Sequence, residues 1–369
     1  MKIANIEVQH FHIPLPTVLS DSTHGEMSHF ELVTVQLHCD NGQTGLGYTY
    51  TVGNGGAAIR TLIEQGLAPS LLGANPGRIE QLWTEMWWRL HYVGRGGIAV
   101  FAISAVDIAL WDLRGRTFGE PLWRLLGGHS RTVQAYAGGI DLQLPLDALL
   151  EQGKQFLGRG FQAIKMKVGR ELLSEDIERV AAMRDLLGPD VPLMVDANMR
   201  WNVGQAIRAA KALARFDVHW LEEPMIPDDF EAHARVTQEG GLPVATGENL
   251  HSIYEFERMI SVGRVSFPQP DVSNIGGITA WIKVAHLAEA HNLCVTTHGV
   301  HDLHVSLLAA VPNASYLEVH GFGLEGFIRQ PLELERGIAL APERPGHGVE
   351  FDWDRLEAHR VESQPGRSR

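Results

Sequence analysis

The sequence is poor in cysteine. Only Cys39 and Cys294 occur among its 369 residues, and they stand far apart without the spacing of metal ligands. This scarcity excludes a disulfide-stapled scaffold and a cysteine metal site, and it indicates reduced thiols in a cytoplasmic protein. A single disulfide between the two cysteines is the alternative.

The sequence also has no excess of basic residues and no long apolar run. It holds 31 Lys and Arg against 44 Asp and Glu, so the net charge is −13, and the basic residues form no stripe. A nucleic acid or an anionic membrane is therefore not expected as a partner. No apolar run approaches the roughly 20 residues needed to cross a bilayer, and no charged-then-apolar leader is visible. A small anionic substrate is compatible with the acidic balance, because a bound cation and lysines can make one pocket positive.

The chain length and a change in hydrophobic period predict two domains. A barrel of eight βα units uses about 250 residues, which leaves a second unit of roughly a hundred. Residues 1 to about 50 alternate apolar and polar side chains, and Asn41-Gly42 is a hairpin signal, so a small antiparallel sheet is expected. From Ala57 to Leu126 the apolar residues recur at helical spacing. These patterns predict an α+β cap over residues 1–130.

After Gly127-Gly128, short apolar segments alternate with helical stretches. This alternation predicts an α/β fold, a modified TIM barrel of the (β/α)7β type over residues 131–335, with an open sheet as the alternative. Residues 336–369 are expected to return to the cap and to end in a polar tail from Glu362. The expected strands are 133–137, 163–168, 193–196, 220–222, 244–246, 265–269, 295–298 and 316–318.

Three carboxylates, Asp196, Glu222 and Glu248, recur at intervals of 26 residues at the ends of apolar runs (LMVDAN, HWLEEP and PVATGEN). One strand plus one helix takes about that length, so consecutive βα units would deliver the acids to one point. Converging carboxylates repel unless a divalent cation lies among them, and an oxygen-only set suits Mg²⁺, for which Mn²⁺ can substitute. Taken singly, each acid could instead be a helix cap or a surface charge.

Cationic and imidazole side chains flank this predicted metal site. Lys165 and Lys167 are two residues apart on one expected strand, so both point into the barrel mouth. Their mutual repulsion and the metal should lower their pKa values, which would make one of them a base near neutral pH. Asp271 precedes His298 by 27 residues, again one unit, and can orient that imidazole, although an ordinary ion pair is the alternative. Glu318 lies on the eighth expected strand and would complete the ring of functional side chains around the barrel mouth.

Proton-transfer groups on opposite sides of a metal suit removal of the proton α to a carboxylate. That carbon acid is too weak for lysine or histidine alone, and the metal would stabilise the charge that develops on the carboxylate. If the β-carbon carries a hydroxyl, the second group can protonate it as it leaves; if not, the second group can return the proton and racemise the substrate. His301 is a rival for His298 but is expected beyond the strand tip. Glu223 is expected to point away from the metal.

Together these motifs resemble the enolase superfamily, and specifically its mandelate racemase subgroup, over essentially the full length of the chain. The resemblance implies that Glu318 faces the substrate carboxylate and that Asn198, in DAN, contacts the pocket or a metal-bound water. It also implies a homo-oligomer, from dimer to octamer. The residues that carry the resemblance are Lys165, Lys167, Asp196, Glu222, Glu248, Asp271, His298 and Glu318.

The resemblance further implies two cap loops over the barrel mouth, Ser20–Ser28 and Thr49–Gly56, that govern specificity. The first loop is polar and suits a polyhydroxylated acid better than an aryl one. His24 and Tyr50, one from each loop, are candidates to contact the substrate. Arg95, in HYVGRGG, is a further candidate, but packing between cap and barrel explains it equally well.

We therefore expect a Mg²⁺-dependent dehydratase of a small-molecule carboxylate, a sugar acid of the aldonate or aldarate class. Lys167 or His298 would take the α-proton, depending on substrate stereochemistry, and His298 would assist loss of the 3-hydroxyl to give a 2-keto-3-deoxy acid. Lys165 would neutralise the carboxylate. A racemase or epimerase of a 2-hydroxy acid is the alternative enzyme. The remaining alternative is a homologue that has lost its catalytic activity, although no expected metal ligand or base is missing from the sequence.

Overall fold

The computed structural model describes residues 1–362, so the predicted polar tail lies outside the described residues except for Glu362. The N-terminal part is a three-stranded antiparallel sheet in the order β1-β2-β3, covered by helices. Its elements are β1 (Ile3–Asp21), β2 (Gly25–Cys39), β3 (Thr44–Thr51), α1 (Gly56–Thr61), the π-helix η1 (Leu62–Leu67), α2 (Ala68–Leu71), α3 (Ile79–Leu90), α4 (Ile98–Phe118) and α5 (Leu122–Leu125).

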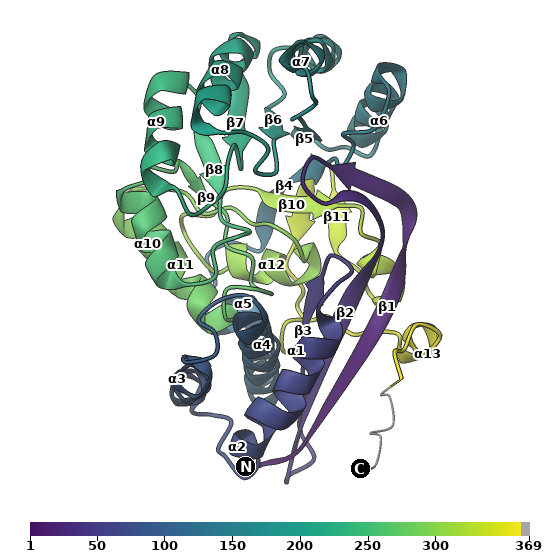
Figure 1. Ribbon diagram of the computed structural model, residues 1–369. Coiled ribbons are helices and arrows are strands. Elements are labelled where there is room, and N and C mark those ends of the chain that lie inside the picture. Colours follow the sequence, from purple (N-terminus) through teal and green to yellow (C-terminus); the bar gives the residue numbers. More distant parts are fainter. Residues whose placement is uncertain (363–369) are drawn as a thin grey trace, which may run out of the picture.

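The following part is a barrel of parallel strands with helices outside it (Figure 1). The strands are β4 (Thr132–Gly138), β5 (Ile164–Lys167), β6 (Leu193–Asp196), β7 (Val218–Glu222), β8 (Val244–Thr246), β9 (Phe267–Pro268) and β10 (Leu317–His320). The helices are α6 (Leu146–Gly158), α7 (Leu173–Leu187), α8 (Val203–Leu213), η2 (Ala214–Phe216), α9 (Phe230–Gly240), α10 (Ile253–Ser261), α11 (Ile278–Ala290) and α12 (His301–Leu308). The cap and barrel predicted from the sequence are confirmed, while the boundaries at residues 130 and 335 stay a prediction.

One predicted strand, 295–298, does not form as a strand. Only an isolated bridge from Val295 to Ala314 is present. The segment still occupies the seventh position, because the Thr296 N–H donates to the Pro268 carbonyl at 3.0 Å on one side and the Val295 N–H donates to the Asn313 carbonyl at 2.9 Å on the other. The barrel closes beyond it, since β10 pairs in parallel with β4.

The C-terminal segment contacts the barrel before it reaches the cap. It contains η3 (Leu324–Phe327), β11 (Glu333–Glu335), β12 (Ile338–Leu340) and α13 (Trp353–Glu357), and β12 pairs antiparallel with β4. Further along, His347 Nε2 lies 2.7 Å from the Leu46 carbonyl oxygen, and the His12 N–H donates to the His359 carbonyl at 2.8 Å. These contacts tie the end of the chain to the cap sheet.

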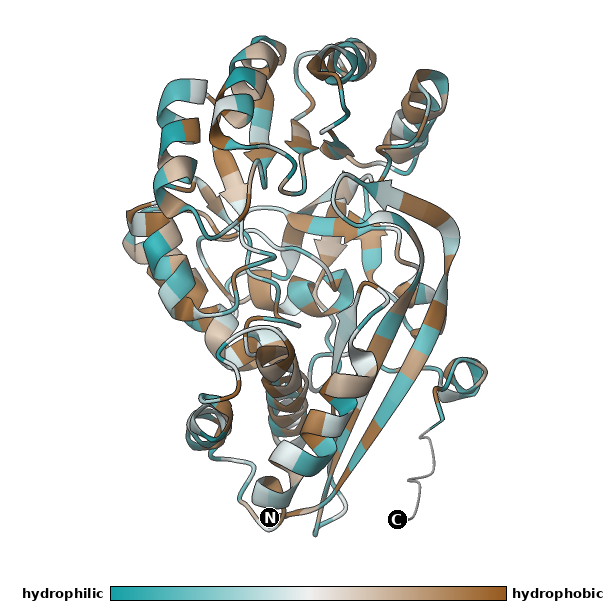
Figure 2. Ribbon diagram, in the orientation of Figure 1, coloured by the Kyte–Doolittle hydropathy of each residue, from teal (hydrophilic) through white to brown (hydrophobic). Residues whose placement is uncertain are grey.

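Helix α4 joins the cap to the barrel. Figure 2 shows it as brown on nearly all sides, and most of its side chains are buried because β3 packs on one side of it and α11 on another. Asp107 of α4 accepts hydrogen bonds from the Thr279 N–H at 2.9 Å and from its hydroxyl at 2.7 Å. The N-terminus of α11, where Gly277 offers no capping side chain, is thus capped from the cap domain. Within residues 1–362, no helix combines the length and apolarity that crossing a bilayer requires.

Close packing of β3 on α4 requires glycine at position 47. A methyl group there would overlap the Ala105 carbonyl oxygen and the backbone of Ala109. We expect Gly47→Ala to lower the free energy of unfolding by about 1–3 kcal/mol through overpacking, measured by chemical denaturation. Gly158→Ala is the matched control, because a methyl group there meets nothing within 4 Å and should raise stability by up to about 1 kcal/mol. Equal stability of the two variants would contradict this packing explanation.

Candidate active site

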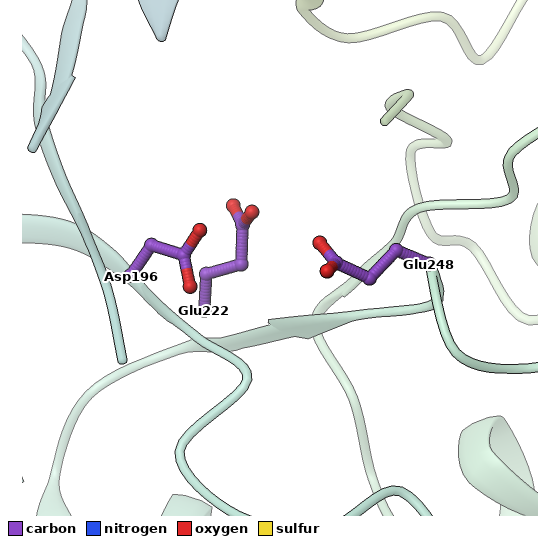
Figure 3. A group of neighbouring side chains, drawn as sticks. All are labelled: Asp196, Glu222 and Glu248. Atoms are coloured by element: carbon purple, nitrogen blue, oxygen red, sulfur yellow. The ribbon is translucent and has the colours of Figure 1, made fainter. Parts of the chain in front are cut away.

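Three carboxylates meet at the C-terminal ends of neighbouring barrel strands. The ladder pairs Asp196 of β6 with Glu222 of β7, and Glu248 follows the end of β8 by two residues. Each offers an oxygen within 4.8 Å of the others, and Figure 3 shows the three side chains turned toward one region. Asp196 and Glu222 are completely buried. The sequence spacing therefore delivers the acids to one point, positioned to hold a metal ion.

The two lysines of β5 lie against these acids. Lys165 Nζ is 2.7 Å from Glu318 Oε1 and also contacts Glu222, and Lys167 Nζ is 2.5 Å from Asp196 Oδ2. Both side chains thus point into the barrel mouth, as the period of two along the strand predicts. The ammonium groups partly neutralise a cluster that would otherwise repel itself.

Among the acids alone, the pKa values of the two lysines are raised; their expected lowering, which counts a bound cation, stays a prediction. Burial disfavours each ammonium group, but the neighbouring carboxylates outweigh it and raise the pKa of both Lys165 and Lys167 above the ordinary value. Conversely, burial would raise the pKa of Asp196, but contact with the two lysines lowers it to about 2. The acids in direct contact oppose the repulsion between the two lysines, and a cation held by these acids would oppose the acids in turn.

Asp271 and His298 lie together on the opposite side of the mouth. His298 Nδ1 is 3.1 Å from Asp271 Oδ2, and His298 Nε2 is 3.2 Å from Glu248 Oε2. The Tyr50 hydroxyl donates to Asp271 Oδ2 at 3.0 Å, and Ser273 donates to Asp271 Oδ1 from its N–H and its hydroxyl. Burial lowers the pKa of His298, but Glu248 and the Asp271 hydrogen bond raise it to about 10. The imidazole is thus oriented by a buried, hydrogen-bonded aspartate.

Comparison with known proteins decides the family. The chain matches the description "Mandelate racemase / muconate lactonizing enzyme, N-terminal domain" over residues 4–127 and "Enolase C-terminal domain-like" over residues 148–355. The chain belongs to the enolase superfamily. Within it, the match to the mandelate racemase subgroup confirms the resemblance seen in the sequence, and the chain is an enzyme of this superfamily.

Several relatives of this superfamily member cover nearly the whole chain. A 3,6-anhydro-α-L-galactonate cycloisomerase of Streptomyces coelicolor is 56% identical over 96% of this chain and 98% of its own length. An L-talarate/galactarate dehydratase of Salmonella typhimurium is 36% identical over 91% of this chain and 85% of its own. A racemase structure from Streptomyces coelicolor with bound magnesium superposes with a TM-score of 0.95 at 54% identity, covering 97% of this chain and all of that one.

A cavity of about 300 Å³ lies between the cap and the barrel rim of this superfamily member and is lined by residues of both. Its lining mixes apolar side chains with histidine, tyrosine and asparagine, and the residues described along it include no lysine or arginine. The lining residues are His24, Tyr50, Thr51, Val52, Asn54, Gly55, Ile59, Gly97, Ile98, Phe101, Glu248, Asn249, His251, Ser273, Asn274 and His298.

The structure places the four predicted substrate contacts differently from one another. His24 and Tyr50 line the cavity, although the Tyr50 hydroxyl is engaged with Asp271. Asn198 is buried beside Asp196, and its Oδ1 has no hydrogen-bond partner. Arg95 is not in this cavity: its exposed side chain lines a separate hollow with residues of α3 and α10. A contact between Arg95 and the substrate therefore stays a prediction.

Several residues near the acids were not predicted from the sequence. Trp220 Nε1 and Gln269 Nε2 each donate to Glu222 Oε2 at 2.9 Å and so fix that carboxylate. Trp220 precedes Glu222 by two residues on β7, so the period of two was an available signal. His320 follows Glu318 by two residues in the same way, and both of its ring nitrogens are buried without partners. Glu223 accepts hydrogen bonds from the Thr246 hydroxyl at 3.1 Å and from Asn249 Nδ2 at 2.7 Å, and burial together with Glu248 and Asp196 raises its pKa.

Proposed function

We propose that this enzyme opens the ring of a 3,6-anhydro sugar acid of the galactonate type to give an isomeric 2-keto-3-deoxy acid. The observation that carries the proposal is the 56% identity, over 96% of the chain, to a 3,6-anhydro-α-L-galactonate cycloisomerase. The reaction needs a group to take the C2 proton and a site that stabilises the resulting charge. Lys167 and His298, on opposite sides of the three acids, supply the first requirement, and the acids supply the second through a cation.

The residues present fit a hard divalent cation. Asp196, Glu222 and Glu248 provide oxygen atoms, the ligands that Mg²⁺ prefers. One oxygen from each residue lies within 4.8 Å of the others. The unpartnered Oδ1 of the buried Asn198 is a further oxygen beside them, as expected for a contact to the ion's water or to substrate. When bound, the ion supplies positive charge that stabilises the substrate carboxylate as its α-proton is lost.

Lys165 and Glu318 are the groups that we assign to the substrate carboxylate. They contact each other at 2.7 Å at the wall formed by β5 and β10, and both are almost fully buried. The ammonium group would pair with the substrate carboxylate. Burial would raise the pKa of Glu318, but Lys165 and His298 lower it, so the ionised Glu318 would hold the Lys165 ammonium in place. Lys167 or His298 then takes the C2 proton, according to which face of the substrate carries it.

The elimination is balanced without loss of any atom. The electron pair of the C2–H bond passes into the carboxylate and then forms a C2–C3 double bond as the C3–O bond breaks. The ring oxygen leaves with that bond pair, stays attached to C6 and becomes a hydroxyl after protonation. The C2 enol then gains a proton at C3 and becomes a ketone. Dehydration of an open-chain sugar acid is the same elimination with water as the leaving group, so the two reactions place the same demands on the site.

The cavity favours a substrate with one carboxylate. An aldarate would carry a second carboxylate away from the metal, but the described residues lining the cavity include no lysine or arginine to pair with it. Apolar side chains at Ile59, Ile98 and Phe101 instead suit the carbon face of a small ring. These features support an aldonate-like anhydro acid over a galactarate or talarate.

The test is incubation with 3,6-anhydro-L-galactonate and Mg²⁺, followed by a colour reaction for 2-keto acids and mass spectrometry of the product. We expect a keto acid of unchanged mass, and little or no product from galactarate. A keto acid formed only from open-chain sugar acids, with loss of one water, would replace this proposal by a dehydratase. Exchange of solvent deuterium at C2 without any keto acid would replace it by a racemase or epimerase.

A further inference from the structure

An exposed group of aromatic side chains lies where the end of α3 meets the start of α10. Trp88 is 61% exposed, Tyr92 92% and Tyr254 69%, and Val93 is 76% exposed. The rings of Trp88 and His91 meet edge to face at 5.2 Å, and those of His91 and Tyr92 at 6.4 Å. We call these five residues the aromatic patch. Single exposed apolar residues are ordinary, but a contiguous group of this size marks an interaction surface.

A hollow of about 760 Å³ lies within the patch, between α3, the segment that follows it and the N-terminal end of α10. Both helices lie along the same side of the molecule, the left edge in Figure 1. Arg95 lines the hollow from the cap and is exposed, and Glu255 lines it from the barrel and is half-buried. The hollow therefore carries both signs of charge.

A surface with both signs of charge is complementary to a second copy of itself. In a two-fold contact the same residues meet from both copies, so each Arg95 can pair with Glu255 of the partner subunit. The net charge of −13 opposes association of two copies in general. At the patch, however, Arg89 and Arg95 offset Glu85 and Glu255, so acidic side chains do not dominate where two copies would meet.

The exposed aromatic area is large enough for a stable contact between copies. One buried aromatic side chain contributes about 150–250 Å², so Trp88, Tyr92 and Tyr254 offer roughly 300–550 Å² at their exposed fractions. A standard interface takes about 800 Å² from each partner. The three side chains therefore supply roughly half of one partner's share, and Val93 and the polar rim add to it.

The segment that carries the patch also forms one wall of the cavity between cap and barrel. Gly97 and Ile98 line that cavity beside His251. The Gly97 N–H donates to His251 Nδ1 at 2.6 Å, and a methyl group at Gly96 would touch the same imidazole. A partner seated on Tyr92 would thus restrict the backbone that leads directly into this wall.

We infer that the aromatic patch is the contact surface for a second copy of this chain, and that this contact fixes the cavity wall at Gly97 and Ile98. Each cavity keeps the acids, lysines and histidines of its own chain. The partner acts only through the segment between the patch and the wall. The inference is independent of which sugar acid the enzyme converts.

The experiment compares wild type with Tyr92→Asp by analytical ultracentrifugation over a range of protein concentrations. We expect wild type to sediment as a dimer or a larger assembly and Tyr92→Asp as a smaller one. The dissociation constant should rise by roughly 100-fold or more, because the contact would bury a carboxylate without a partner. Tyr92→Phe should assemble like wild type, since it keeps the aromatic ring. Circular dichroism checks that the variants fold.

The kinetic part of the experiment uses whichever sugar acid wild type converts. In Tyr92→Asp, KM should rise several-fold while kcat changes less, because the acids and bases are intact and only the cavity wall is released. An unchanged KM in the smaller assembly would overturn the role assigned to that wall. If no sugar acid reacts, the proposed function fails, and sedimentation alone still decides the contact.

Phe118→Asp is the matched control, because this aromatic residue at the end of α4 is 64% exposed and lies outside the patch. It should leave both the assembly and KM unchanged. A wild type that stays monomeric at every concentration would overturn the inference and leave the patch to a different partner. Assembly of Tyr92→Asp at the wild-type size would overturn it as well, and so would an equal loss of assembly in Phe118→Asp.

Discussion

Lys167→Ala and His298→Asn are each expected to lower keto-acid formation by about 10²–10⁴-fold, the usual contribution of a positioned acid or base. The two groups face the acids from opposite sides, with Lys167 Nζ 2.5 Å from Asp196 and His298 Nε2 3.2 Å from Glu248. One of them takes the C2 proton. The variant lacking that group should also lose exchange of the C2 proton with solvent deuterium, whereas the other variant should keep it.

Steady-state kinetics and deuterium exchange followed by NMR provide the two measurements, with circular dichroism to check folding. Lys154→Ala is the control for removal of a lysine, because its side chain is 60% exposed and forms only a surface pair with Glu151. It should leave turnover unchanged. Full turnover by both Lys167→Ala and His298→Asn would contradict the roles assigned to them.

Removal of the metal is the second change with a large expected effect. Chelation should abolish measurable turnover, and Mg²⁺ should restore it, because a bound cation contributes several kcal/mol of charge stabilisation and each 1.4 kcal/mol is about tenfold in rate. The fold should survive, since Lys165 and Lys167 still pair with Glu222 and Asp196. The melting temperature should rise as Mg²⁺ is added back, because the ion binds only the folded state.

Glu222→Gln tests the same site from the protein side. We expect a loss of roughly 10³-fold or more that saturating Mg²⁺ does not restore, because the amide removes one anionic ligand. Glu231→Gln is the control, an exposed acid of α9 that lies 3.7 Å from Arg258. Undiminished activity after exhaustive chelation, or in Glu222→Gln, would contradict a metal held by these acids.

The strands that precede or carry the three acids could be predicted from the sequence, because barrel strands are buried on both faces and are therefore apolar throughout. Their apolar runs are continuous, and 193–196 and 244–246 form strands with the predicted bounds. Residues 295–298 (Val-Thr-Thr-His) are less apolar, and although the first three are buried they make only an isolated bridge. The composition of a segment indicates whether it is buried. Whether it forms a hydrogen-bonded ladder depends on the backbone of the neighbouring segments, which the residues at 295–298 do not determine.

The site was predictable where contacts follow strand period and unit spacing. Lys165, Lys167 and the three acids were found in this way. The Tyr50 contact to Asp271 spans 221 residues and left no local signal, and the raised lysine pKa values depend on how many carboxylates converge. The Asp21–His24 contact spans only three residues, so it was within reach of a sequence argument. The cytoplasmic location and the homo-oligomer stay predictions.

The hydrogen bond from Tyr50 to Asp271 has a consequence for engineering and for divergence within the superfamily. Thr49 donates to the Ser273 carbonyl oxygen at 2.7 Å on the same segment, so two consecutive cap residues support the barrel's aspartate. A barrel grafted onto a foreign cap would keep every acid and base, and Asp271 would keep its hydrogen bonds from Ser273 but lose the one from Tyr50. New specificities obtained by exchanging caps therefore require the two halves to be inherited as matched pairs.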